Sequence, residues 1–266
     1  MYGVMLLLAI VACVVLTGIR WTRMGGDWDL VLRVAVWGVA AGIVGARLYH
    51  VITSWSEVPD PKWQGVFEIW KGGLGVWGGI LGGVIAGAIV VRRSGNSVYR
   101  FMDAVAPGLL LAQAIGRWGN YFNQELFGKP TDLPWALEID VQNRPEPYIS
   151  EPTFHPLFLY ESIWNLLGVG FLLLVDRRFT IRPPGLFALY VAWYTAFRTY
   201  EETLRIDPAH EYLGLRLNFY VSVTLFALAI AAFIWSQRRP ETSARPRRTA
   251  PPSGPKMAVP KGRVRR

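Results

Sequence analysis

Residues 2–19 read YGVMLLLAIVACVVLTGI, an apolar run without a charged side chain. A helix needs about 20 mostly apolar residues to cross the hydrocarbon core of a bilayer. The run has no basic segment before it and no convincing small-residue cleavage site within it, so it is interpreted as a membrane helix and not as a secretory signal. This stretch therefore places the chain among helical membrane proteins.

The rest of the chain repeats this pattern. The predicted helices cover about 2–19, 31–53, 74–91, 101–122, 155–175, 184–203 and 215–236. Only 18% of the residues are charged, against about 25% in a typical soluble domain. The 12 Trp and 11 Tyr are residues that collect at the headgroup level of bilayers. The sequence predicts an all-α, polytopic membrane protein with seven transmembrane helices.

Basic residues in alternate loops indicate how these helices are oriented. One side holds Arg20, Arg23, Arg92, Arg93, Arg100, Arg177, Arg178, Arg182 and the C-terminal tail, and the other holds Lys62, Lys71, Lys129, Arg144, Arg205 and Arg216. Because positive charge concentrates in cytoplasmic loops, we expect the N-terminus outside and the C-terminus in the cytoplasm.

The chain divides into two parts by composition. We expect a membrane domain over 1–237, with an outer loop at about 123–153, and a basic, Pro-rich, disordered tail over 238–266. The net charge of +9 lies in loops and in this tail, and no basic stripe follows one helix. That distribution argues against a nucleic-acid partner.

Two further features are interpreted as packing. Gly75, Gly79, Gly83 and Gly87 recur every four residues in GGLGVWGGILGGVIAGAIVV, residues 72–91, and such a ridge lets another helix approach closely. Cys13 is the single cysteine and lies within an apolar run. It allows no internal disulfide and no Cys-based metal site.

The informative residues are ionisable groups at membrane depth, which by default suggest function. They are Arg47, with His50 three residues later; Arg117, followed by Asn120, Asn123 and Glu125; and the stripe of Tyr194, Arg198, Glu202 and Arg205. Internal ion pairs such as Arg198–Glu202 or Arg117–Glu125 are one explanation. The other is an arginine cluster that holds a phosphate through fork-like hydrogen bonds, and in a membrane the abundant phosphate is a lipid headgroup.

A histidine and a long loop complete the candidates. His155 begins the fifth predicted helix, where it could act as a general base, although a hydrogen bond to a neighbour is the favoured interpretation. The segment 123–153 is too long for a tight turn, and loops of this size are often functional.

The motif GRWGNYFNQELFG at 116–128 resembles the signature of the prolipoprotein diacylglyceryl transferase family. Further matching segments are Tyr2-Gly3, GARLY at 45–49, GGLGVWGG at 72–79, HPLFLYE at 155–161 and YTAFRTYEE at 194–202. The resemblance implies transfer of the diacylglyceryl group of phosphatidylglycerol to the lipobox cysteine thiol of a prolipoprotein. It also implies release of glycerol phosphate, a place in the bacterial plasma membrane, and no metal or soluble cofactor.

The resemblance also implies residue roles. Arg117 and Arg198 would bind the headgroup and stabilise the departing phosphate, with Glu125 and Glu202 positioning the arginines and Tyr2 near the chemistry. The other expected contributors are Asn120, Gly128, Asn123, Arg47, Tyr194, Arg205 and His155. One residue departs from the family: where well-studied members have a histidine proposed to activate the thiol, this chain has Trp77.

Three other functions compete with this one. A transporter would use the same buried charges, but no internal repeat is present. A serine-type intramembrane protease would need a serine in a nucleophile context, which Ser54 and Ser56 lack. A non-catalytic binder of an anionic lipid headgroup stays open from the residues alone, because binding and turnover share side chains.

Overall fold

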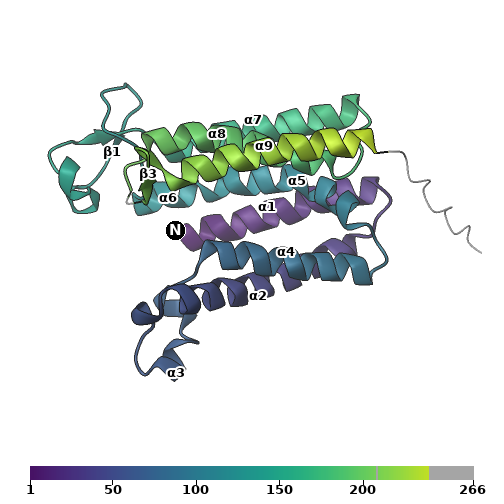
Figure 1. The fold of residues 1–266 in the computed structure, drawn as a ribbon, viewed down its shortest axis with the longest axis horizontal. Coiled ribbons are helices and arrows are strands. Elements are labelled where there is room, and N and C mark those ends of the chain that lie inside the picture. The colour runs from purple at the N-terminus through teal and green to yellow at the C-terminus, as the bar shows by residue number, and fades with distance from the viewer. Residues whose placement is uncertain (208, 240–266) are drawn as a thin grey trace, which may run out of the picture.

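A computed structural model describes residues 1–207 and 209–239, so that nearly all of the predicted tail at 238–266 lies outside the described residues. Within them the chain is a bundle of long helices (Figure 1). The helices of 18 residues or more are α1 (Tyr2–Arg23), α2 (Trp28–Thr53), α4 (Val76–Arg93), α5 (Val98–Gly116), α7 (Leu157–Arg178), α8 (Gly185–Leu204) and α9 (Leu217–Arg238). Each of the seven predicted apolar runs therefore corresponds to one long helix.

The membrane character is clearest in part of this set. By length and composition, α1, α2, α4, α7 and α9 can each cross a membrane. Charged side chains also lie among the buried residues of the long helices: Arg20 in α1, Arg47 in α2, Asp103 in α5, Glu161 in α7, and Glu201 and Glu202 in α8. These ionisable groups face the interior of the protein, as expected for such groups at membrane depth.

The fourth predicted helix, 101–122, differs from the observed one. α5 ends at Gly116, and a short helix α6 (Trp118–Asn123) begins after Arg117. Arg117 lies at this break, and α6 continues along the line of α5 to the end of the bundle (Figure 1).

The long helices form two groups on either side of α1. α1 packs against α5, α5 against α7, α8 against α9, and α2 against α4. Figure 1 shows α5, α7, α8 and α9 together, with α1 between them and the α2–α4 pair. α4 meets α5 over a short stretch only.

The short elements lie at one end of the bundle. The predicted outer loop contains β1 (Leu137–Glu138), paired antiparallel with β2 (Thr153–Phe154), around a small core of Phe127, Ile139 and Phe154. A second hairpin joins β3 (Glu211–Tyr212) to β4 (Leu215–Arg216). Between α2 and α4, the segment 54–75 holds α3 (Lys62–Gly65) and two 3₁₀ turns, Trp55–Glu57 and Ile69–Lys71.

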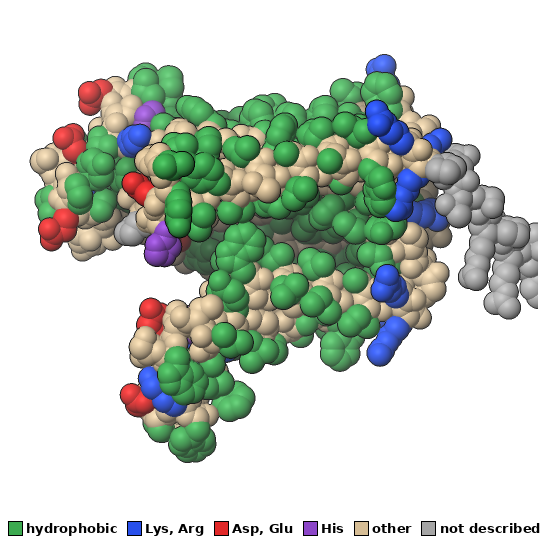
Figure 2. Space-filling model, in the orientation of Figure 1, with side chains coloured by type: hydrophobic (Ala, Val, Ile, Leu, Met, Phe, Trp, Pro, Cys, Tyr) green, Lys and Arg blue, Asp and Glu red, His purple; other side chains and the backbone are tan. Residues whose placement is uncertain are grey.

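The charges gather at the two ends of the bundle. Figure 2 shows Lys and Arg side chains without acidic ones at one end, acidic and basic side chains together at the other, and an apolar band between them. Arg20 belongs to the basic end but does not lie in a loop as predicted. It is a buried residue of α1 that pairs with Asp176 at 3.0 Å and donates to the carbonyls of Asp103 and Ala104.

The glycine ridge of α4 packs against another helix, as predicted, and that helix is α2. Cβ atoms built on Gly79, Gly83 and Gly87 would meet α2 atoms at 3.3–3.4 Å. The tightest approach is at the neighbouring Gly78, where an added Cβ would lie 2.2 Å from the carbonyl oxygen of Gly45. The two helices therefore pack backbone against backbone at this point.

We expect Gly78→Ala to destabilise the protein by about 2 kcal/mol, because the new methyl group meets backbone that cannot move aside. Thermal unfolding in detergent should show a fall in Tm of about 5 °C. Gly79→Ala is the matched control, since its Cβ would lie 3.4 Å from the Ala46 Cβ, an ordinary contact. Equal Tm values for the two variants would contradict the packing assigned here.

Candidate functional site

The site lies where the α5–α6 break, the start of α7 and the end of α8 meet. Arg117 projects from the break and places its Nη2 2.6 Å from Oε2 of Glu161. Glu161 lies in the first two turns of α7 and is almost fully buried, whereas the Arg117 side chain keeps 19% of its surface exposed. One side of the guanidinium is thus held while part of it stays accessible.

Arg198 is held by two carboxylates of its own helix, α8. Its Nη1 lies 2.8 Å from Oε2 of Glu201, and its Nη2 pairs with Glu202. The spacings of three and four residues put these groups on one face of α8. The predicted Arg198–Glu202 pair is confirmed, and Glu201 is a second partner.

The ion pairs continue into the outer segments. Glu202 also accepts from Nε of Arg216 at 2.7 Å, and Asp207 accepts from Arg205 at 2.7 Å and from Arg216 at 2.9 Å. Burial opposes ionisation of the Asp207 carboxyl, but the hydrogen bond from Arg205 and the charges of Arg205 and Arg216 outweigh it. The net result is a lowered pKa of Asp207.

Arg117 and Arg198 belong to one cluster. Both lie near Tyr194 and Glu201, and Arg198 lies near enough to Arg117 for their charges to influence one another. Arg198 keeps 16% of its side-chain surface exposed. Two guanidinium groups from different helices are therefore oriented by carboxylates and accessible in part, an arrangement suited to a phosphate.

Glu125 is connected to Arg117 only through Asn120. The predicted direct pair between them is not formed. Instead, Glu125 accepts from Nδ2 of Asn120 at 2.9 Å and from Nδ2 of Asn123 at 3.3 Å, and Asn120 is 3.5 Å from Nη1 of Arg117, a weak contact. The reason is the left-handed backbone of Gln124, φ 48°, which turns Glu125 back toward Asn120.

Gly128 joins three segments at this site. Its N–H donates to the carbonyl of His155 at 2.9 Å, and it forms an isolated bridge with Arg205. A Cβ on Gly128 would lie 2.9 Å from the His155 Cβ, so only glycine allows this approach without a shift.

His155 and Tyr2 also border the motif. His155 shares a 3.1 Å hydrogen bond with the hydroxyl of Tyr160, which confirms the hydrogen-bonding interpretation, and burial lowers its pKa. The ring of Tyr2 packs on Gly119, where an added Cβ would be 2.6 Å from Cδ2. The N-terminal tyrosine thus lies beside the 116–128 motif.

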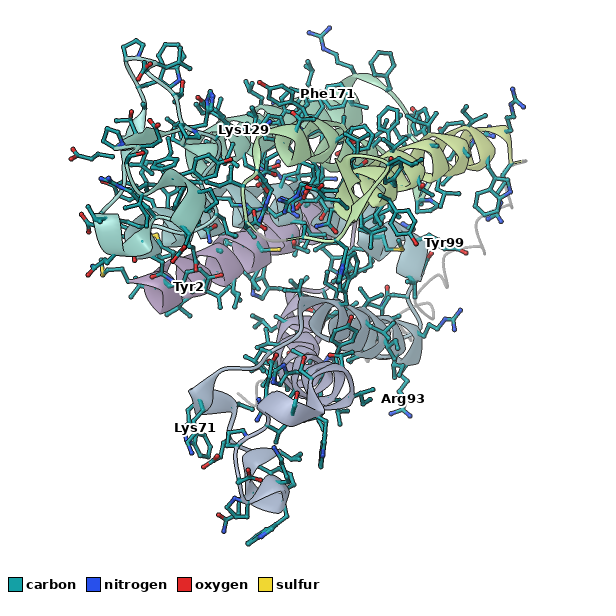
Figure 3. The ribbon with its side chains drawn as sticks, turned by 60° about the vertical axis from the view of Figure 1, so that its left-hand side comes forward. Tyr2, Lys71, Arg93, Tyr99, Lys129 and Phe171 are labelled. Carbon is teal, nitrogen blue, oxygen red and sulfur yellow. The ribbon has the colours of Figure 1, made fainter. Side chains whose placement is uncertain are left out.

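Arg47 is engaged elsewhere. Its guanidinium donates to the carbonyls of Val66, Gly72 and Gly73 at 2.7–2.9 Å and to that of Gly65. It therefore fixes the segment 54–75 and lines, with His50, a cavity of about 170 Å³. Figure 3 shows Lys71 on this segment, projecting away from the part of the bundle that carries Lys129 and Phe171.

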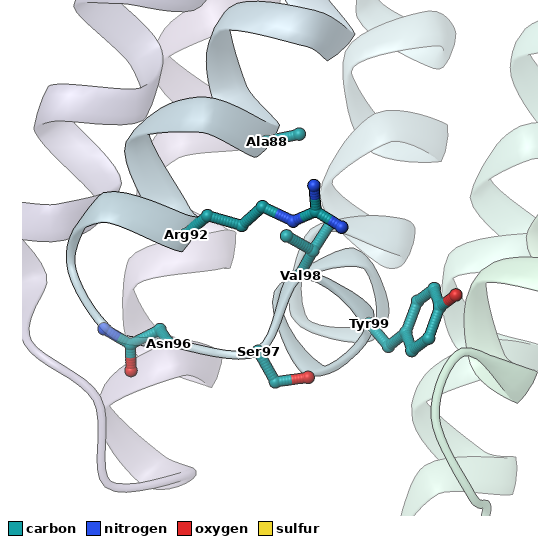
Figure 4. A pocket seen from close by; sticks show the side chains of 6 residues that line it. All are labelled: Ala88, Arg92, Asn96, Ser97, Val98 and Tyr99. Carbon is teal, nitrogen blue, oxygen red and sulfur yellow. The ribbon is translucent and has the colours of Figure 1, made fainter.

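A second cavity, of about 430 Å³, lies at the other end of α5. Figure 4 shows Arg92 reaching into it below Ala88, with Val98 and Tyr99 opposite. Because α5 is 19 residues long, about 28 Å separates this cavity from Arg117. Its lining holds one cation and no acid, so it lacks the paired arrangement of the other end.

Sequence reasoning assigned no role to four members of the cluster: Glu161, Glu201, Arg216 and Asp207. A signal existed for two of them. Glu161 ends the segment HPLFLYE, and Glu201 precedes the predicted Glu202. No sequence signal pointed to Arg216 or Asp207, because their pairing depends on how the segment after α8 folds back.

Cys13 contacts Thr17 of its own helix, with the sulfur 4.0 Å from the hydroxyl. An added Cβ on Gly108 would lie 3.2 Å from this sulfur, so the thiol packs at the α1–α5 contact. We expect Cys13→Ala to keep turnover within about twofold and Tm within about 3 °C, the range for loss of one small buried group. A Cys13→Ala protein that folds but has lost its activity would overturn this assignment.

Known proteins match nearly the whole described chain. The sequence model of the prolipoprotein diacylglyceryl transferase family matches residues 1–235. The chain belongs to this family. It is 48% identical over 240 residues to the phosphatidylglycerol–prolipoprotein diacylglyceryl transferase of Cutibacterium acnes, covering 90% of this chain and 81% of that protein.

Two other family members are similarly related. The protein of the same name from Bifidobacterium adolescentis is 43% identical over 251 residues, covering 89% of this chain and 75% of its own length. The Frankia alni protein is 48% identical over 243 residues, covering 89% of this chain, and the chain spans 63% of that protein's length. The described membrane bundle is thus the part of the chain shared with the family.

Proposed function

We propose that this chain transfers the diacylglyceryl group of phosphatidylglycerol to the lipobox cysteine thiol of a prolipoprotein. The observation that carries the proposal is the pair Arg117 and Arg198, both held by buried carboxylates in one cluster at the end of the bundle. The names of the family relatives support the same reaction.

The chemistry balances with these groups alone. The thiol sulfur attacks the glyceryl carbon that carries the phosphate, a C–S bond forms, and the C–O bond breaks with its electron pair on the phosphate oxygen. The thiol proton ends on the released glycerol phosphate. Arg117 and Arg198 stabilise the charge that develops on the leaving oxygen, and the step uses no metal and no soluble cofactor.

Neighbouring residues would prepare the two arginines. Glu202 orients Arg198, and Glu125 acts through Asn120 on Arg117. Gly128 and His155 hold the outer segment against the site. Tyr2, Asn123, Tyr194 and Arg205 would border the space offered to the headgroup, and Arg47 of α2 would act only through the segment 54–75 whose carbonyls it holds.

This chain has Trp77 at the position where the family has a histidine that is proposed to activate the substrate thiol. Guanidinium groups lower the pKa of a nearby thiol, so binding beside Arg117 and Arg198 would favour the thiolate. The phosphate itself then receives the proton at the end of the step.

The protein would work in the bacterial plasma membrane as a seven-span protein with its N-terminus outside and its C-terminus in the cytoplasm. The basic end carries Arg23, Arg92, Arg93, Arg100 and Arg178, which favours the cytoplasmic side. At the other end Trp63, Phe67 and Trp70 are each 72–75% exposed. Aromatic side chains of this kind favour the bilayer interface.

A reconstituted assay tests the reaction. Purified protein is incubated with phosphatidylglycerol labelled in both glycerol units and a lipobox peptide, and the products are the diacylglyceryl peptide and glycerol phosphate. A peptide with serine in place of the cysteine is the control. A transporter or a binder would form neither product. Absence of both products with folded protein would refute the proposal.

Cysteine labelling tests the orientation. In a Cys13→Ala background, Ser56→Cys should react with a membrane-impermeant maleimide in intact cells, whereas Ser94→Cys should react only after lysis. The reverse pattern would refute the orientation and leave the transfer reaction untouched.

A further inference from the structure

Asn165 of α7 is a polar side chain sealed inside the bundle. It is 0% exposed, and neither its Oδ1 nor its Nδ2 has a hydrogen-bond partner among the described residues. Leaving an amide buried without partners costs several kcal/mol in general. Folded proteins satisfy such groups with ordered water wherever protein atoms do not.

Gln113 of α5 and Tyr190 of α8 lie at the same depth. Leu110 packs beside Gly168, and Ser162 donates to the carbonyl of Ala114 at 3.0 Å, so residues near 113 face residues near 165. Gln113 donates from Nε2 to the Tyr190 hydroxyl at 3.2 Å, while its Oε1 is buried without a partner in the described chain. Three helices thus bring polar groups to one level.

Glu161 lies one turn from Asn165 on the same face of α7. Its Oε2 forms the 2.6 Å ion pair with Arg117, although neither Oε2 nor Oε1, both buried, accepts a hydrogen bond of ordinary geometry from a described residue. An ionised carboxylate offers about four acceptor sites. This Oε1 atom, the inner oxygen of Glu161, therefore lacks a donor among the described residues, as Oε1 of Gln113 does.

We propose that Asn165, Gln113 and Glu161 enclose ordered water that donates to the inner oxygen of Glu161, so that Asn165 and Gln113 are positioning residues for Arg117. The water connects two unpaired acceptors, Oε1 of Gln113 and Oε1 of Glu161, to the amide of Asn165. It holds Glu161 ionised and in place, and Glu161 in turn holds the guanidinium. The catalytic consequence rests on the proposed function, whereas the water site itself does not.

The direction in which Asn165→Leu changes Tm tests whether the site holds water. If the site is dry, leucine removes two unpaired polar atoms from the interior at nearly constant volume, and Tm rises. If the site holds water, leucine expels it and leaves the Gln113 and Glu161 oxygens without donors. We expect a fall in Tm of about 3 °C or more, and an unchanged or raised Tm would overturn the proposal.

Kinetics test the positioning role. Provided that the wild-type protein transfers the diacylglyceryl group, Asn165→Leu should lower kcat about tenfold relative to it, because Arg117 is misplaced. The KM for phosphatidylglycerol should change less than twofold. Asn165→Ser keeps a hydroxyl and leaves room for another water, so it should restore most of kcat. A loss that serine does not restore would mark Asn165 as a packing residue only.

A double variant tests whether the two residues share one water network. Asn165→Leu combined with Gln113→Leu should be no less stable than either single variant, because the water is lost once. Additive losses of Tm would show independent sites and refute the shared water. If the wild-type protein forms no lipidated peptide, the two Tm experiments still decide the water site while the proposed function fails.

Discussion

Replacing Arg117 with lysine is expected to lower kcat for diacylglyceryl transfer by about 10²–10³-fold, the usual effect of removing one donor that stabilises developing charge. A lysine at this position offers a point charge and cannot pair with Glu161 while presenting a second donor edge to a phosphate. The measurement is a single-turnover assay with saturating phosphatidylglycerol and lipobox peptide.

The control for this variant is at the other end of the same bundle. Arg92→Lys changes the same residue type beside the cavity formed by α4 and α5, and its kcat should stay within about twofold. Arg198→Lys should fall as Arg117→Lys does. If Arg117→Lys retains wild-type kcat while folding normally, the phosphate assignment is wrong.

Glu161→Ala is expected to have the largest effect on stability. It leaves the Arg117 guanidinium, whose side chain is 19% exposed, without the carboxylate that compensates its charge. Removing one partner of a buried pair costs about 3–5 kcal/mol, and Tm should fall by roughly 10 °C. Turnover should fall as well, since the guanidinium is no longer oriented.

Two further variants separate charge from shape at this position. Glu161→Gln keeps the volume and removes the charge, and it should lose nearly as much stability as Glu161→Ala. Glu151→Ala removes an exposed acid of the outer segment and should leave Tm within about 2 °C. A Glu161→Ala protein with wild-type Tm would show that the Arg117–Glu161 pair contributes nothing to the fold.

Local rules were sufficient for the helices and for contacts within a helix. The apolar runs predicted seven long helices; the ends of six lie within four residues of those observed, and the fourth ends at Gly116 instead of at 122. The four-residue spacing of Arg198 and Glu202 predicted their ion pair, and the glycine ridge predicted a close helix partner. Each of these depends on residues close in sequence, whose relative positions are set by helix geometry.

The carboxylate that pairs with Arg117 could not be predicted from nearby residues. Glu125 is eight residues away and was the expected carboxylate, yet Glu161, 44 residues away, is the group in contact. The choice depends on the break between α5 and α6 and on how α7 is rotated against α5. Both follow from side-chain packing between helices, which the sequence spacing does not encode.

The sequence by itself determined that this chain is a helical membrane protein, and its motif at 116–128 determined the family. The tertiary structure alone decided which carboxylates hold Arg117 and Arg198, and that Arg47 holds backbone carbonyls of the segment 54–75. The physical reason is that helix period and hydrophobicity are properties of neighbouring residues. A buried charge, by contrast, takes whatever partner the packing of distant helices brings within reach.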